Sequence, residues 1–157
     1  MGHGEGLNSE PTRRGTVTSF RDLRVWHAAM GLVRSVYLVT RGFPRDEAYG
    51  LTSQLRRAAV SVPSNIAEGH AREHLREYLH HLSMAQGSLA ELETQLEIAL
   101  SLEYVGADQI GALFDELRSV ARQLKALRIA LERKLPTHRR NSEIREDGIP
   151  YPMTYDQ

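Results

Sequence analysis

Apolar side chains recur every three or four residues along most of the chain, in four separate runs. This spacing puts them on one face of an α-helix, and it predicts helices over about 20–41, 45–68, 71–104 and 107–135. The fourth run alternates spacings of three and four for three heptads, which is typical of packed helices. No segment combines the alternation of a β-strand with the turn residues that would support it.

Residues with known positional preferences mark the ends of these runs. Ser19 with Asp22 three residues later predicts the start of the first helix, and Gly42 with Pro44 predicts its end. The connections are short, so sequential helices must lie antiparallel. The predicted fold is therefore all-α, an up-down-up-down four-helix bundle over 19–135.

Both ends of the chain lack this periodicity and are polar. We expect disordered tails at 1–18 and 136–157. The apolar residues at 149–155 could dock in an extended form on a neighbouring surface, although a disordered end is the expectation.

Composition narrows the functional classes. A chain of 157 residues, 41% hydrophobic and 25% charged, fits one domain with its own core. Lys plus Arg and Asp plus Glu are both 20, so nucleic-acid binding would need a local basic patch. The absence of cysteine excludes disulfides and thiolate sites and fits the cytoplasm. No apolar run is long enough to cross a membrane.

The segment 56–69, with sequence RRAAVSVPSNIAEG, breaks the helical pattern with polar residues around a proline. Pro63 removes a backbone donor, so it should kink or interrupt the second helix. Asn65 and Glu68 resemble a capping box for a restarted turn that ends at Gly69.

The polar side chains of this segment and of the third helix can meet across the helix pair. We expect a buried polar network with an architectural role, with ligand binding as the alternative. Its predicted members are Arg57, Ser61, Pro63, Asn65, Glu68, Gly69, Ser88, Glu91 and Glu93.

Residues 70–74, HAREH, match the short pattern of inverted zinc peptidases, with His70 and His74 as ligands and Glu73 as base. The pattern lacks a third ligand, so a metal-dependent hydrolase is a remote alternative. His70, His74, Glu77 and His81 form a straight line on one helix, which cannot enclose an ion. No phosphate loop or nucleophile elbow occurs. We therefore predict no metal, no cofactor and no enzymatic activity.

Basic residues line one face of the fourth helix. A symmetric assembly would repeat such a stripe and could bind phosphate groups. The alternative is pairing with nearby acids, among them Asp115, Glu116 and Glu132. The candidate nucleic-acid contacts are Arg56, Arg118, Arg122, Lys125 and Arg128.

Several segments together resemble a known family: FRDLRVW at 20–26, EAYGL at 47–51, QLRRAAVSVPSNIAEG at 54–69, AQGSL at 85–89 and ELETQL at 91–96. They strongly resemble four-helix bundle proteins encoded by intervening sequences of bacterial 23S ribosomal RNA genes. The resemblance implies a cytoplasmic bacterial homopentamer, similar to the accessory variability protein of diversity-generating retroelements, which binds nucleic acid and a reverse transcriptase. The expected partners are the chain itself, RNA or DNA, and possible further proteins; a scaffold without nucleic-acid binding is the alternative.

Overall fold

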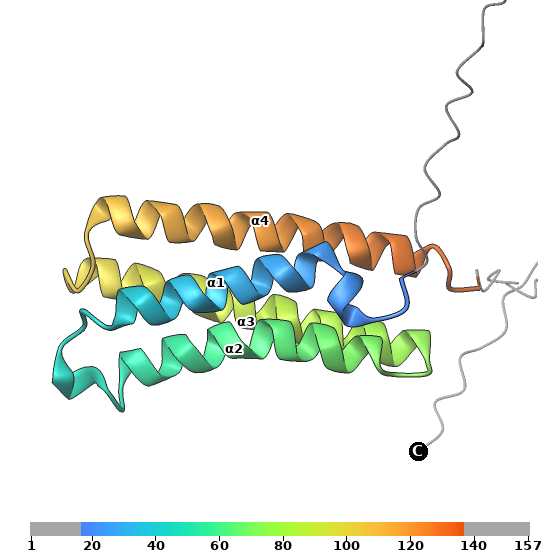
Figure 1. The fold of residues 1–157 in the computed structure, drawn as a ribbon, viewed down its shortest axis with the longest axis horizontal. Helices are drawn as coiled ribbons and strands as arrows, with labels where there is room; N and C mark the ends of the chain where they lie inside the picture. Colours follow the sequence, from blue (N-terminus) through green and yellow to red (C-terminus); the bar gives the residue numbers. More distant parts are fainter. Residues whose placement is uncertain (1–16, 137–157) are drawn as a thin grey trace, which may run out of the picture.

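The computed structural model describes residues 17–136, and they form an antiparallel bundle of four α-helices without a strand in that range (Figure 1). The connections lie at alternate ends of the bundle, which is the predicted up-down-up-down order. The predicted tails at 1–18 and 136–157 lie outside the described residues, apart from positions 17, 18 and 136. The helices are α1 (Arg24–Thr40), α2 (Leu51–His70), α3 (Leu75–Ser101) and α4 (Ala107–Glu132).

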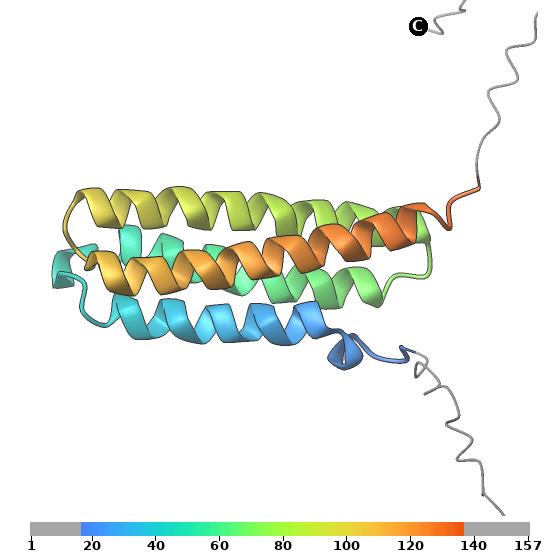
Figure 2. The same cartoon turned by 90° about the horizontal axis from the view of Figure 1, so that it is seen from above.

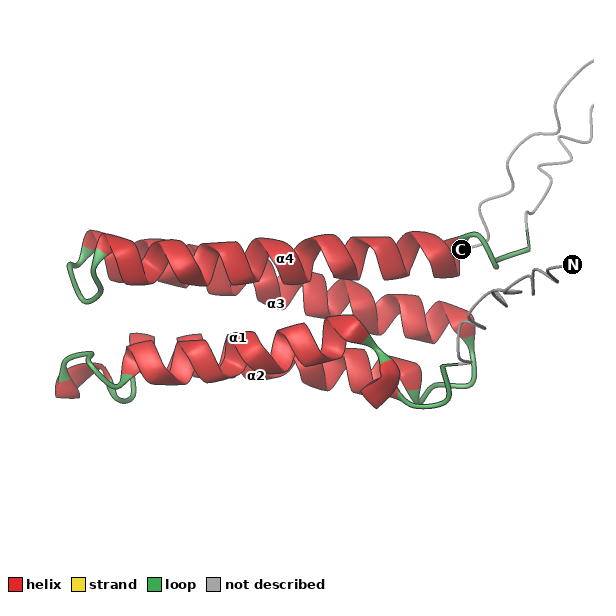
Figure 3. Ribbon diagram, turned by 45° about the horizontal axis from the view of Figure 1, so that its top comes forward, coloured by secondary structure: helices red, strands yellow, loops and turns green. Residues whose placement is uncertain are grey.

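The bundle has two layers, with α1 and α2 in one and α3 and α4 in the other (Figure 3). The view from above shows that the helices run side by side for nearly their whole length (Figure 2). Each helix packs against the next in sequence, and α1 closes the bundle against α4. The start of α1, the end of α2, the start of α3 and the end of α4 therefore meet at one end, called here the first end.

The apolar stripes of all four helices meet in one core. Burying a leucine side chain contributes about 2 kcal/mol relative to leaving it in water, so this core is the main source of stability. The largest fully buried side chains are Leu32, Val36, Leu55, Val62, Ile66, Leu82, Leu92, Leu96, Leu113, Val120 and Leu124.

The start of the first helix differs from the prediction. Ser19 and Asp22 do form a capping box, but it caps a 3-10 turn, η1 (Phe20–Asp22), and α1 begins only at Arg24. The Asp22 carboxylate accepts hydrogen bonds from the backbone of Ser19, at 2.9 Å, and of Thr18, at 3.0 Å. These bonds favour the charged form and lower the pKa of Asp22 below its usual value.

The second helix also begins later than predicted. A 3-10 turn, η2 (Arg45–Glu47), follows Pro44, and α2 starts at Leu51. The Glu47 carboxylate accepts a hydrogen bond of 2.8 Å from the Leu51 backbone, which satisfies one of the free donors at the start of α2. The other carboxylate oxygen accepts a hydrogen bond of 3.1 Å from the Tyr104 hydroxyl. Glu47 therefore links the connection between α1 and α2 to the connection between α3 and α4.

Pro63 does not interrupt α2, which is a single helix from Leu51 to His70. The expected restart after Pro63, with Asn65 and Glu68 as its capping box, is therefore wrong. The Asn65 side chain instead forms a hydrogen bond within the continuous helix, in which Nδ2 donates to the Ser61 carbonyl at 2.9 Å.

Candidate functional site

A chain of polar side chains links α2 to α3 near the first end. The Ser88 hydroxyl donates to the Ser61 hydroxyl at 2.9 Å, and Asn65 Nδ2 donates to the same oxygen at 3.0 Å. Asn65 Oδ1 lies 3.3 Å from His81 Nδ1. Asn65 is buried, and its hydrogen bonds are what make burial of its amide tolerable.

The chain continues to the surface beyond His81. His81 Nε2 lies 3.7 Å from a carboxylate oxygen of Glu68, which is also paired with Arg72 one turn away. Glu68 is more than half exposed, so this outer pair adds little stability by itself. The network thus extends from the buried amide of Asn65 to the exposed carboxylate of Glu68, and it holds α2 and α3 in register.

Three expected members of the network do not join it. Glu91 accepts a hydrogen bond of 2.9 Å from Gln95, and Glu93 is exposed. Arg57 makes no hydrogen bond or ion pair with any residue of 17–136. His81 takes the place expected for Arg57; it is seven residues before Ser88 and thus on the same helix face, a spacing that could have identified it.

Gly69 permits the close approach of α2 and α3 beside this network. A Cβ atom at this position would lie 2.8 Å from Tyr78 Cδ2 and 2.8 Å from His81 Cβ. The Tyr78 hydroxyl is buried and has no partner among the described residues. Burial raises the pKa of Tyr78 to about 12, because the charged phenolate would lose its hydration.

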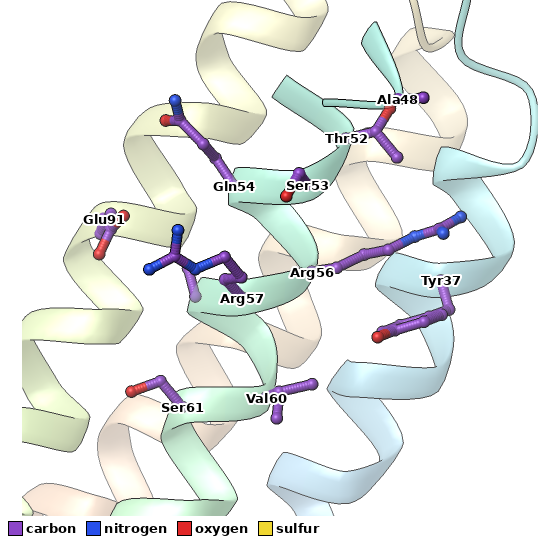
Figure 4. Close-up of a pocket in the computed structure, with 11 residues that line it drawn as sticks. Tyr37, Ala48, Thr52, Ser53, Gln54, Arg56, Arg57, Val60, Ser61 and Glu91 are labelled. Atoms are coloured by element: carbon purple, nitrogen blue, oxygen red, sulfur yellow. The ribbon is translucent and has the colours of Figure 1, made fainter. Parts of the chain in front are cut away.

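The outer face of α2 carries a hollow of about 780 Å³ with two neighbouring arginines (Figure 4). Arg57 extends toward Glu91 on α3, whereas Arg56 extends the other way, toward Tyr37 on α1. The Arg56 guanidinium carbon lies 4.6 Å from the centre of the Tyr37 ring, and its Nε donates to the Thr40 hydroxyl at 2.9 Å. The guanidinium groups diverge, so they do not form a joint phosphate clamp.

The zinc-peptidase pattern does not lie on one helix. α2 ends at His70 and α3 begins after His74, so the segment expected to start the third helix is the connection between them. His70 packs edge-on against the Tyr78 ring. No group of three potential ligands able to hold a metal occurs among residues 17–136. The geometry that the remote hydrolase alternative required is therefore missing here.

Of the five candidate nucleic-acid contacts, two are paired with acids. Arg118 binds Asp115 at 2.7 Å, and Arg128 binds Glu132 at 3.2 Å. The third acid expected to pair, Glu116, instead accepts from Ser35 of α1.

The other candidates divide between two places. Arg122 and Lys125 are exposed and form no ion pair within the described range, whereas Arg56 lies on α2 near the opposite end of the bundle. Arg56 therefore lies apart from the four candidates on α4.

A groove of about 480 Å³ between α1 and α4 brings in a basic residue that the sequence interpretation missed. Arg24 and Arg122 both line it, together with Asp22. The Asp22 carboxylate is already engaged in capping η1. Arg24 and Arg122 are 98 positions apart in the sequence, so only the pairing of α1 with α4 reveals their proximity.

Charge is distributed unevenly along the bundle. The half at the first end (17–31, 61–87 and 120–136) has nine Lys and Arg against five Asp and Glu, a net charge of +4. The other half (32–60 and 88–119) has six against nine, a net charge of −3. The overall neutrality of the sequence thus conceals a basic end.

Comparison with known proteins gives a family and a fold. A family model described as 23S rRNA-intervening sequence protein matches residues 21–126. A crystal structure of a protein of unknown function from the S23 ribosomal protein family of Bacteroides thetaiotaomicron has a TM-score of 0.61 and 20% identity. That match covers 67% of this chain and 95% of the other, and it shows the shared fold. No curated protein matches the chain. Within 17–136, no helix has the length and apolar character needed to cross a membrane.

Proposed function

The chain belongs to the 23S rRNA-intervening sequence protein family, and on this premise we propose that it is a non-enzymatic, homo-oligomeric bundle that binds nucleic acid at its basic first end. The net charge of +4 on this half of the bundle is the observation that carries the proposal. Basic surfaces bind the phosphate backbone without reading sequence, with a strong dependence on salt.

The groove between α1 and α4 is the proposed centre of this surface. Arg24 and Arg122 line it, and Lys125 follows Arg122 one turn later on α4. None of the three forms an ion pair with another residue of 17–136, so their charges are available to phosphates. Arg118 and Arg128, which have acidic partners, are proposed to contribute less.

Self-assembly would multiply this weak surface. Exposed apolar side chains occur on every helix, including Leu38 at 59%, Met84 at 46% and Ile98 at 43%. Such side chains favour contact with another chain. A homopentamer in the cytoplasm would present five basic ends, and their fields would add.

The test is binding of fluorescent single-stranded RNA, structured RNA and duplex DNA at several salt concentrations. The double variant Arg122→Glu with Lys125→Glu should weaken binding at least tenfold and flatten the salt dependence. The double variant Arg41→Glu with Arg45→Glu makes the same charge change at the other end and should have a much smaller effect. Circular dichroism checks that all variants remain folded.

Undetectable binding of every nucleic acid at low salt would overturn the nucleic-acid part of the proposal. The alternative would then be a protein-interaction scaffold, tested by recovering partners after nuclease treatment. Light scattering tests self-assembly separately, since a monomer at micromolar concentration contradicts the homopentamer.

A further inference from the structure

An apolar groove lies between α1 and α2 near the first end, on a different side from the basic groove. It has a volume of about 300 Å³. We call it the Trp26 groove, after the chain's one tryptophan. It is lined by Phe20, Trp26, Met30, Val33, Val60, Pro63, Ser64 and Ala67.

The walls of the Trp26 groove are suited to an apolar, extended segment. The Phe20 and Trp26 rings pack edge-to-face, with centres 5.2 Å apart, and no charged side chain of residues 17–136 lines the groove. Met30 is 39% and Val60 40% exposed, so apolar surface on both sides faces outward. The Arg21 guanidinium lies 4.6 Å from the centre of the Phe20 ring and puts a positive charge at one border.

The chain itself contains a segment of matching chemistry. Residues 149–155 read IPYPMTY, with prolines at 150 and 152. Each proline fixes its own φ and biases the preceding residue to an extended form, so the segment favours a polyproline II conformation. Segments of this kind bind in aromatic-lined grooves because little conformational entropy remains to be lost.

Chain length and charge both permit this pairing within one molecule. α4 ends at the first end, where η1 and the start of α1 also lie (Figure 1). The 13 residues at 137–149 can span roughly 40 Å, about the length of a 26-residue helix. From Glu143 onward the chain has four acids and one arginine, a net charge of −3, opposite to the +4 of the first end.

We propose that residues 149–155 occupy the Trp26 groove of their own chain, with the tyrosine and proline side chains covering Trp26 and Met30. The Trp26 groove, between α1 and α2, is separate from the groove between α1 and α4 that is proposed to bind nucleic acid. It would also keep the groove from associating with other proteins.

Cysteine cross-linking tests the proposal directly, since the natural chain has no cysteine. Ser64 is exposed and lines the groove, so Ser64→Cys is combined in the full chain with Gly148→Cys or Met153→Cys. The matched control places the first cysteine at Ser83, an exposed serine on α3. In at least one tail position, the Ser64 pair should form an intramolecular disulfide more than tenfold faster than the Ser83 pair.

Trp26 fluorescence gives a second, independent readout. The variant Tyr151→Ala should increase acrylamide quenching of Trp26 about twofold, whereas Asn141→Ala, outside the segment, should leave it unchanged. Equal cross-linking rates at Ser64 and Ser83 together with unchanged quenching would overturn the proposal. Disulfides that form only between chains would overturn it as well, because the occupant would then be the tail of a second copy.

Discussion

His81 of α3 is hydrogen-bonded to Asn65 of α2, with 3.3 Å between the ring Nδ1 and the amide Oδ1. Asn65 is buried, and its Nδ2 also donates hydrogen bonds to the carbonyl and the hydroxyl of Ser61. The same amide is therefore bonded both within α2 and across to α3. α2 and α3 have the most extensive contact of any helix pair in the bundle, and this hydrogen bond is one of the polar contacts between them.

Replacing Asn65 should therefore be costly. Asn65→Leu removes the hydrogen bonds and leaves the Ser61 and His81 groups without their partner, so the free energy of unfolding should fall by about 1–3 kcal/mol. Urea unfolding followed by circular dichroism measures this. The control Ser64→Ala removes an exposed hydroxyl whose bond is to its own helix, and its effect should stay within about 0.5 kcal/mol. Equal effects of the two variants would show that the hydrogen bond between the helices adds no more to stability than the bond within α2.

Gly69→Ala should destabilise the bundle. The added Cβ would lie 2.8 Å from side-chain atoms of Tyr78 and His81 and 3.2 Å from the Tyr78 carbonyl, so the helices would have to separate. Overpacking of this kind typically costs about 1–3 kcal/mol. The loss should appear as a lower midpoint in thermal or urea unfolding.

A matched glycine provides the control for that experiment. Gly87 lies inside α3, and a Cβ there would meet no atom within 4 Å. Gly87→Ala should stabilise the protein by about 0.5–1 kcal/mol, because alanine loses less backbone entropy in a helix. A gain at both positions would contradict the close approach at Gly69.

The helices could be predicted because each has an apolar stripe that a sequence displays directly. The ends were less predictable. Ser19 and Asp22 form the expected capping box, but it serves a 3-10 turn, since the backbone at Leu23 is extended before α1 begins. Pro63 shows the opposite case: a strong local breaker lies inside a continuous helix, because the buried residues on both sides of it keep that helix packed in the core.

The polar network and the basic surface could be identified in full only from the tertiary structure. The sequence predicts Ser61, Asn65 and Ser88 as members of the network, but it places His81 only in the row of histidines that begins at His70. The contact with Asn65 depends on the separation of α2 and α3, which Gly69 sets and no periodicity encodes. In the same way, Arg24 joins Arg122 only because α1 packs against α4.

Glu47→Ala should loosen the end of the bundle opposite the first end. Its carboxylate accepts from the Leu51 backbone and from the Tyr104 hydroxyl, so alanine frees a donor at the start of α2 and removes the link to the next connection. The expected loss is about 1–2 kcal/mol in urea unfolding. Asp46→Ala changes the same charge one residue earlier and makes none of these contacts, so it should have a smaller effect. Faster amide hydrogen exchange at Leu51 would locate the change.

Tyr78 should lose its proton at a higher pH than an ordinary tyrosine, because burial raises its pKa from 10.0 to about 12. In the unfolded chain it would lose its proton near pH 10, so the folded state binds more protons between about pH 10 and 12. The Tyr78 contribution to stability is therefore complete below pH 10 and is lost as the pH rises toward 12.

Absorbance at 295 nm, recorded with circular dichroism at each pH, measures both processes. Tyr78→Phe should remove the latest tyrosine transition and weaken the alkaline loss of stability, whereas Tyr49→Phe, at a fully exposed position, should leave that transition in place. Ionisation of every tyrosine below pH 11 with the helices intact would contradict the buried, unpartnered hydroxyl of Tyr78.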